Sequence, residues 1–186
     1  LYCSFGSHPL KQWGHLMEPY LEALKKELAF IAEQMGDRPL HTIYMGGGTP
    51  TTLPAEQMEE LLQFLADTFP VETAKEFTVE AGRPDTITEE KLAVLKAYPV
   101  SRISINPQTM NQKTLDLIGR KHTVEDTEKA YRLARRLGFD NINMDLIVGL
   151  PGEGREEVAH TLEEMKRFHP DSLTVHSLAL KRATRL

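Results

Sequence analysis

Three consecutive glycines, Gly46–Gly48, directly follow a short apolar, β-favouring run at residues 40–45. A helical pattern begins near Ala55, so the glycines lie between an expected strand and an expected helix. Backbone without side chains at a strand end suits a ligand that must approach the main chain closely. The spacing is not G-x-G-x-x-G and lacks the lysine of a P-loop, so neither nucleotide-binding motif fits. A tight turn between strand and helix is the alternative interpretation.

Polar side chains alternate with apolar ones along the next three expected strands. The polar members, which would share one face of a sheet, are Thr78, Glu80, Ser104, Asn106, Asn143 and Asp145. Parallel strands that are covered on both faces read as continuous apolar runs. Buried carboxylates are costly unless they are hydrogen-bonded or face a wet, ligand-filled cavity. We therefore expect Glu80 and Asp145 to line the polar interior of a barrel, with a purely structural hydrogen-bonding role as the alternative.

Strands and helices alternate along the chain, which predicts βαβ units and a parallel sheet. Strands are expected at residues 40–45, 75–81, 100–106, 141–148 and 172–177. Helices are expected at residues 17–35, 55–68, 88–97, 111–119, 124–137 and 153–168, and residues 1–14 read as irregular. An open antiparallel sheet with one face in water is disfavoured, because each connection is long enough for a crossover. We expect an α/β fold, a partial (β/α) barrel with five parallel strands, whose site lies at their carboxyl ends.

Length and composition narrow the function classes. The 186 residues suit one domain, the net charge of -5 gives no general footprint for nucleic acid, and no apolar run is long enough to span a membrane. One cysteine excludes an internal disulfide and fits a reducing compartment, so a cytoplasmic location is expected. The chain starts at Leu1 and has no leader-like segment, so we expect a fragment that lacks its natural N-terminus.

Taken in order, these residues resemble the radical S-adenosylmethionine (SAM) enzymes, and within them the oxygen-independent coproporphyrinogen III oxidases. The sequence Leu1-Tyr2-Cys3 is similar to the end of the family's C-x3-C-x2-C motif, which holds a [4Fe-4S] cluster by three thiolates. The other two cysteines would precede Leu1. Cys3 alone is weak evidence, since a lone cysteine is usually a small buried apolar residue; the order of matches after it carries the resemblance.

The resemblance implies a set of SAM-binding residues at strand ends and in the loops after them: Tyr2, Gly47, Gly48, Thr49, Glu80, Gln108, Arg120, Asp145 and Ala179. The glycine backbone would meet the methionyl part of SAM, and a carboxylate such as Glu80 suits ribose hydroxyls or an ammonium. Arg120 would clamp a carboxylate with two parallel hydrogen bonds. The alternative for Arg120 is a solvated patch with Lys121 and His122.

Within the family, three stretches resemble the coproporphyrinogen dehydrogenase branch of Gram-positive bacteria: Asn106–Gln108, Glu80–Asp85 and Leu178–Arg182. That branch implies decarboxylation of coproporphyrinogen III propionates to vinyl groups by a SAM-derived radical, with electrons from a donor such as a flavodoxin or ferredoxin. Arg83, Lys181 and Arg182 are candidates for binding the carboxylates of the porphyrinogen substrate, with ordinary solubilising charges as the alternative.

Two other functions stay open at this point. Related haem-binding chaperones share the same cluster and SAM motifs, and a barrel remnant without cluster ligands would be non-catalytic. Residues 1–186 are expected to be a radical SAM core domain that lacks the upstream cluster ligands, the first barrel strand and the C-terminal region that covers the substrate.

The single cysteine leads to a test on the 186-residue chain. Anaerobic incubation with iron and sulfide is expected to leave it nearly metal-free, because a [4Fe-4S] cluster normally takes several thiolates. Iron and acid-labile sulfide analysis measures this, with a chain extended to include upstream cysteines as the control. A stoichiometric cluster on the unextended chain would contradict the expectation.

Overall fold

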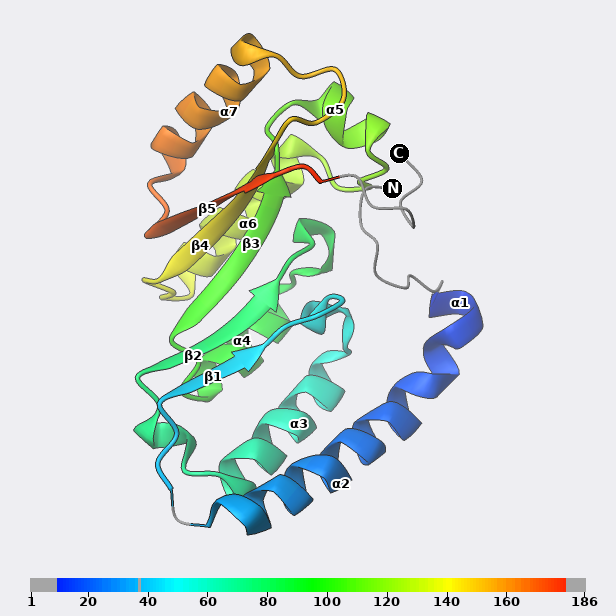
Figure 1. The fold of residues 1–186 in the computed structure, drawn as a ribbon, viewed down its shortest axis with the longest axis vertical. Helices are drawn as coiled ribbons and strands as arrows, with labels where there is room; N and C mark the ends of the chain where they lie inside the picture. The colour runs from blue at the N-terminus through cyan, green and yellow to red at the C-terminus, as the bar shows by residue number, and fades with distance from the viewer. Residues whose placement is uncertain (1–9, 37, 180–186) are drawn as a thin grey trace.

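The computed structural model describes residues 10–36 and 38–179. Its five parallel strands form one open sheet in the order β1-β2-β3-β4-β5 (Figure 1). The strands are β1 Thr42–Met45, β2 Glu76–Ala81, β3 Arg102–Gln108, β4 Ile142–Val148 and β5 Ser172–Ser177. Each strand lies beside its neighbours in sequence, as the helical crossovers between them require. The expected partial barrel of five parallel strands is confirmed.

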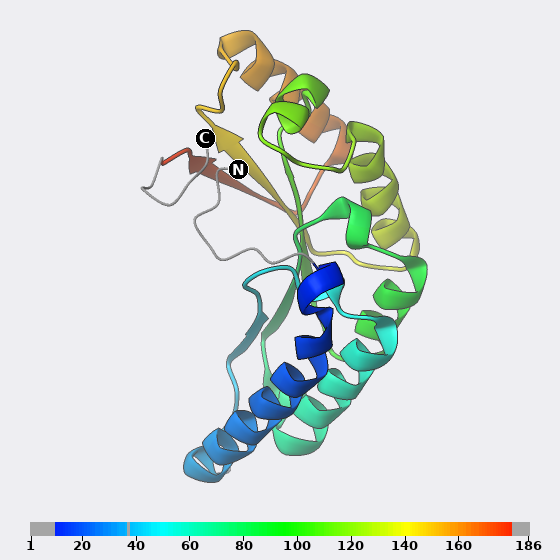
Figure 2. The ribbon, with the colours of Figure 1, turned by 90° about the vertical axis from the view of Figure 1, so that its right-hand side faces the viewer.

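The helices lie along one face of the sheet, where α3, α4, α6 and α7 form an arc (Figure 2). They are α1 Leu10–Trp13, α2 Met17–Met35, α3 Ala55–Thr68, α4 Glu89–Ala97, α5 Gln112–Leu117, α6 Val124–Arg136 and α7 Arg155–Phe168. The helices at residues 17–35 and 55–68 have the expected bounds. The short α1 lies in a stretch that reads as irregular in the sequence. Within the described ranges, none of the helices combines the length and the apolar character needed to cross a membrane.

The hydrophobic core lies between the sheet and these helices. Phe77 and Val79 of β2, Ile103 and Ile105 of β3, and Met144 of β4 are almost completely buried. Burying a side chain of this size contributes about 1.5–3 kcal/mol relative to leaving it in water. The period-two pattern of these strands therefore fixes which face the helices cover.

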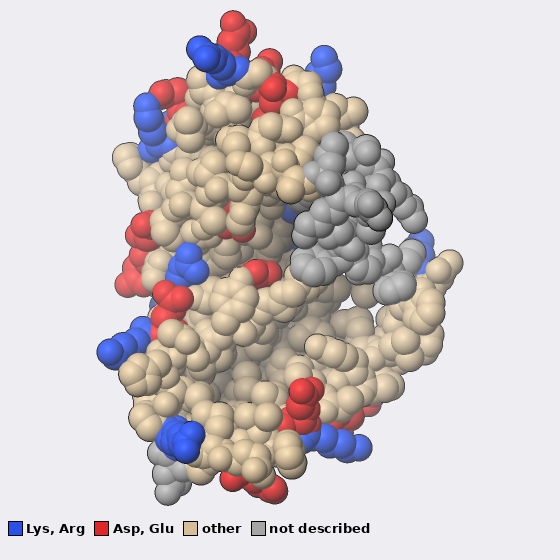
Figure 3. All heavy atoms as spheres, in the orientation of Figure 1, with Lys and Arg blue, Asp and Glu red and all other residues tan. Residues whose placement is uncertain are grey.

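The opposite face of the sheet is polar, as the alternation in the sequence predicts. Figure 3 views this open face, which is hollowed at its centre and carries few charged atoms there. Its best-connected residue is Asn143, only 3% exposed. The Asn143 amide donates to Ser104 Oγ at 2.9 Å and to Asp145 Oδ1 at 2.5 Å. Its carbonyl oxygen accepts from Ser172 Oγ at 2.9 Å and Thr174 Oγ1 at 3.0 Å.

β3 contains an irregularity that the sequence pattern does not predict. The register with β4 runs from Ile105 opposite Met144 to Gln108 opposite Leu146, so β3 has one extra residue there. Pro107 lies inside this bulge, where its missing N–H costs no ladder bond. Gln108 has a φ of 72°, and β3 continues to it instead of ending at Asn106.

His122 is buried close to this bulge, with 1% of its surface exposed. Burial lowers its pKa first, and the nearby Arg120 guanidinium lowers it further. The Pro107 carbonyl, Asp85 and Asp126 each act to raise the pKa. The net shift of the His122 pKa is nevertheless downward. His122 is therefore a neutral imidazole packed behind the bulged end of β3.

The lowered pKa of His122 predicts a loss of stability in acid. An unfolded histidine binds a proton near pH 6.5, whereas folded His122 binds it only at lower pH. The unfolded state then holds more protons, so the free energy of unfolding falls as pH drops from about 7.5 towards 5.5. Urea unfolding should show a weaker fall for His122→Asn, while His160→Asn, at an exposed position of α7, should behave like the wild type. Equal pH dependence in all three proteins would contradict this.

A second prediction concerns Asn143. Replacing it by leucine should lower the free energy of unfolding by about 1–3 kcal/mol, because buried Ser104 of β3 and partly buried Ser172 of β5 lose their hydrogen bonds. Thr174→Val removes only the bond between Thr174 and Asn143 and should cost less. Urea midpoints of the two variants measure the difference. An Asn143→Leu variant as stable as the wild type would show that the polar network is dispensable.

Candidate functional site

The glycine loop leaves the carboxyl end of β1 and leads into the 3-10 turn Pro50–Thr52. Gly47 has a φ of 107°, which favours glycine. A Cβ added at Gly47 or Gly48 would meet no atom of the described residues within 4 Å, so these residues leave open space beside both glycines. The tight-turn interpretation accounts for Gly47 but leaves Gly48 unexplained, since Gly48 has no left-handed backbone.

Lys91 ties this loop to the turn after β2. Its Nζ donates to the Thr51 carbonyl at 2.6 Å and to the Thr86 carbonyl at 3.3 Å. The hydroxyls of Thr51 and Thr86 are 2.7 Å apart. Burial lowers the pKa of Lys91, as expected for an amine that exchanges water for carbonyls. Lys91 was not among the expected site residues, because a lysine in the first turn of a helix usually points into solvent.

Glu80 lies one residue before the end of β2, on the open face. Its Oε1 accepts a hydrogen bond from the Tyr44 hydroxyl of β1. Loss of water around the hydroxyl, and then the Glu80 carboxylate, raise the pKa of Tyr44 to about 12. Tyr44 therefore stays a hydrogen-bond donor throughout the physiological range. Tyr44 was not among the expected site residues, and its position two residues before Gly46 is the only sequence signal that points to it.

Asp145 lies on the same face, two strands from Glu80. Besides Asn143, Ser104 Oγ donates to Asp145 Oδ1 at 3.5 Å. Asp145 Oδ2 lies 3.7 Å from His176 Nε2 of β5. Structural hydrogen bonding thus accounts for one oxygen of Asp145, while the other is directed towards an exposed imidazole. Ser104, opposite Glu80 in the register of β2 and β3, connects the two carboxylate positions.

Gln108 is the last residue of β3, and Arg120 follows shortly after α5. Gln108 is 6% exposed, and its Oε1 has no hydrogen-bond partner in the described part of the chain. Arg120 Nη1 donates to the Gly82 carbonyl at 3.3 Å, which joins the segment after α5 to the loop after β2. The alternative of a solvated patch is wrong for His122, which is buried, although Lys121 is exposed.

The remaining residues expected in the site lie in the segments after β2 and β5 or outside the described residues. Arg83 is half-buried and directly precedes the 3-10 turn Pro84–Thr86, and Ala179 lies exposed just beyond β5. Tyr2, Cys3, Lys181 and Arg182 lie outside the described residues. Between residues 10 and 179, excluding residue 37, no cluster of three or more His, Cys, Asp or Glu could hold a metal ion.

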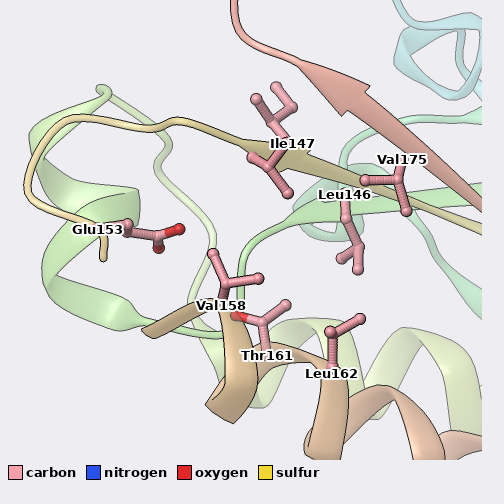
Figure 4. A pocket seen from close by; sticks show the side chains of 8 residues that line it. Leu146, Ile147, Glu153, Val158, Thr161, Leu162 and Val175 are labelled. Atoms are coloured by element: carbon pink, nitrogen blue, oxygen red, sulfur yellow. The ribbon is translucent and has the colours of Figure 1, made fainter. Parts of the chain in front are cut away.

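A small apolar cavity of about 150 Å³ lies elsewhere, between β4, β5 and α7 (Figure 4). Leu146 extends from β4 towards Val158 and Leu162 of α7. Leu173 and Val175 of β5 are partly exposed on this helix-facing side. None of the expected site residues lines the cavity, so it belongs to the packing of the last helix and not to the site.

The chain is similar to known proteins along most or all of its length. The family model described as the Radical SAM superfamily matches residues 1–165. The chain is 49% identical over 188 residues to the oxygen-independent coproporphyrinogen-III oxidase-like protein HemZ of Bacillus subtilis (strain 168), covering 100% of this chain and 38% of HemZ. It is 34% identical over 184 residues to the heme chaperone HemW of the same organism, covering 98% of this chain and 48% of HemW.

A solved structure extends the comparison to the fold. Coproporphyrinogen III oxidase HemN of Escherichia coli, described as a radical SAM enzyme, matches with a TM-score of 0.81 and 32% identity, over 89% of this chain and 38% of HemN. The chain spans less than half the length of each of these relatives. The family match over residues 1–165 and the shared partial barrel lead to one conclusion: the chain belongs to the radical SAM superfamily.

Proposed function

We propose that the complete protein uses SAM and a [4Fe-4S] cluster to convert propionate side chains of coproporphyrinogen III to vinyl groups, giving protoporphyrinogen IX. The observation that carries this proposal is the 49% identity, along the whole chain, to a coproporphyrinogen-III oxidase-like protein. HemN of Escherichia coli, a coproporphyrinogen III oxidase, supports the same reaction at 32% identity.

The described residues fit SAM as a ligand. SAM carries an ammonium and two ribose hydroxyls, which are donors, and the site offers Glu80, Asp145 and exposed backbone at the glycine loop as acceptors. The open space beside Gly47 and Gly48 suits close approach of the methionyl part to the main chain. The unpartnered Oε1 of Gln108 is a further acceptor at the end of β3. Cys3, the expected cluster ligand, and Tyr2 beside it lie outside the described residues.

When bound, the cluster and SAM would supply the one-electron chemistry that removes hydrogen from the substrate. The chain's own residues would bind and orient. Glu80 and Asp145 would accept hydrogen bonds from the ligand, and the Thr49 and Gly48 backbone would line its methionyl end. Arg120, whose Nη1 donates to the Gly82 carbonyl, is proposed to hold a ligand carboxylate through its guanidinium.

Three further elements belong to the proposal. Arg83, Lys181 and Arg182 are proposed to meet the carboxylates of the porphyrinogen, and Ala179 to contact the adenosine end of SAM. A flavodoxin or ferredoxin is proposed as the electron donor. A cytoplasmic location is proposed because a single cysteine and an iron–sulfur cluster both suit a reducing compartment.

A haem-binding chaperone is the second candidate, favoured by the 34% identity to HemW over 98% of the chain. The residues around the glycine loop serve both candidates equally. The two functions differ in what happens to the tetrapyrrole: an oxidase releases two carboxyl groups as CO2, whereas a chaperone binds haem and leaves it unchanged.

The deciding experiment is an anaerobic assay of the complete protein with a reconstituted cluster, SAM, a reductant and coproporphyrinogen III. We expect formation of protoporphyrinogen IX, followed by chromatography after oxidation to the porphyrin. Glu80→Gln should lower turnover at least tenfold, because the amide removes the charge that suits SAM's donors. Glu27→Gln, at an exposed position of α2, should leave it unchanged. Stoichiometric haem binding without any turnover would overturn the oxidase in favour of the chaperone.

A further inference from the structure

Tyr44 is an unusual residue for the open face of this sheet. Tyr44 is 63% exposed, and Thr78, its partner in the register of β1 and β2, is polar. An aromatic ring on such a face exposes apolar surface without gaining burial. Its hydroxyl nevertheless bonds to Glu80, a strand away and two residues further along the register. The ring is thus placed by this bond and not by packing in the core.

Gly46 explains how the ring reaches that position. A Cβ on Gly46 would collide with the Tyr44 ring, mainly with Cε1. The Gly46 backbone has no left-handed φ, so its lack of a side chain is required by the ring and not by the turn. Gly47 and Gly48 differ, because no atom of the described residues lies within 4 Å of a Cβ added at either position. The first glycine therefore accommodates Tyr44, and the second and third are left for a ligand.

The hydrogen bond from Tyr44 uses one of the two carboxylate oxygens of Glu80. Oε1 accepts from Tyr44, and none of the hydrogen bonds among the described residues involves Oε2. A carboxylate held at one oxygen loses rotational freedom, so the second oxygen meets a ligand donor at a smaller entropic cost. The ring also connects the glycine loop to β2, so the two parts of the ligand site keep a fixed spacing.

We propose that Tyr44 is a positioning residue of the SAM site: its hydroxyl holds Glu80 Oε1, over Gly46, so that Oε2 is presented to a donor group of SAM. The inference rests on the proposed use of SAM and deepens it. The competing arrangement is that Tyr44 occupies the place of the ligand's own donor. In that case, removing its hydroxyl would strengthen SAM binding.

The first test measures SAM affinity of the complete protein with its cluster reconstituted, by isothermal titration calorimetry under anaerobic conditions. Tyr44→Phe keeps the ring over Gly46 and removes the hydroxyl, and should raise the dissociation constant about fivefold to tenfold. Tyr20→Phe, an equally exposed tyrosine on α2, should match the wild type. The melting temperatures of both variants should equal that of the wild type, which separates positioning from folding.

An unchanged or lower dissociation constant for Tyr44→Phe overturns the inference while the wild type still binds SAM. A wild type that does not bind SAM removes the proposed function itself, and the inference with it. A drop in melting temperature of Tyr44→Phe that accounts for its weaker binding would assign Tyr44 a structural role and also overturn the inference.

The second test needs no SAM. In the cluster-free complete protein labelled with [13Cζ]-tyrosine, the Tyr44 resonance is identified by its loss in Tyr44→Phe. Between pH 9 and 10.5 it should keep the shift of a protonated phenol, whereas an ordinary tyrosine with a pKa of about 10 begins to ionise. Glu80→Gln should move Tyr44 ionisation towards this range. Ordinary titration of wild-type Tyr44 would show that the Tyr44–Glu80 bond does not form in solution, and would overturn the inference.

Discussion

The buried side chain of Asn143 donates hydrogen bonds to two acceptors and accepts hydrogen bonds from two donors within the sheet. The polar network of the open face depends on these four bonds. A sheet that packs helices on one face must present its alternate residues on the other. Those residues are desolvated by their neighbours even where no helix covers them. An amide that joins β3, β4 and β5 lowers the cost of this burial, because each polar group finds a partner. Asp145 can then remain an acceptor on the same face.

Hydrogen bonds between loops fix the carboxyl edge of the sheet. The Nζ of Lys91 joins the loops after β1 and β2, and the Arg120 guanidinium joins the loop after β2 to the segment after α5. These three hydrogen bonds all end on backbone carbonyls, so they restrain the main chain directly. They order the carboxyl edge of the sheet without using an oxygen of Glu80 or Asp145. This separation between restraint and binding suits the SAM site proposed above.

Much of this architecture follows from periodicity in the sequence. The alternation at Phe77–Ala81 and Ile142–Val148 determines which face meets the helices, and the glycine run marks a strand end. Other features depend on contacts between distant segments. Pro107 reads as the end of a strand, yet the bulge lets β3 continue past it to Gln108. His122 follows two cations and reads as solvated, but the bulged end of β3 and the groups near it bury it. Tyr44 reads as an ordinary strand aromatic until its bond to Glu80 is seen.

The two edge strands of the sheet bear on how the chain behaves in solution. β1 and β5 lie at opposite edges of the sheet, and along each the backbone lacks a neighbouring strand among the described residues. On β5, Leu173 and Val175 add partly exposed apolar side chains on the helix-facing side. An edge that combines free backbone donors and acceptors with β-favouring apolar residues is a template for strand addition by a second chain. The 186-residue chain, studied alone, is therefore a candidate for edge-to-edge self-association through β5, whose kinetics would depend on concentration and not on its ligand.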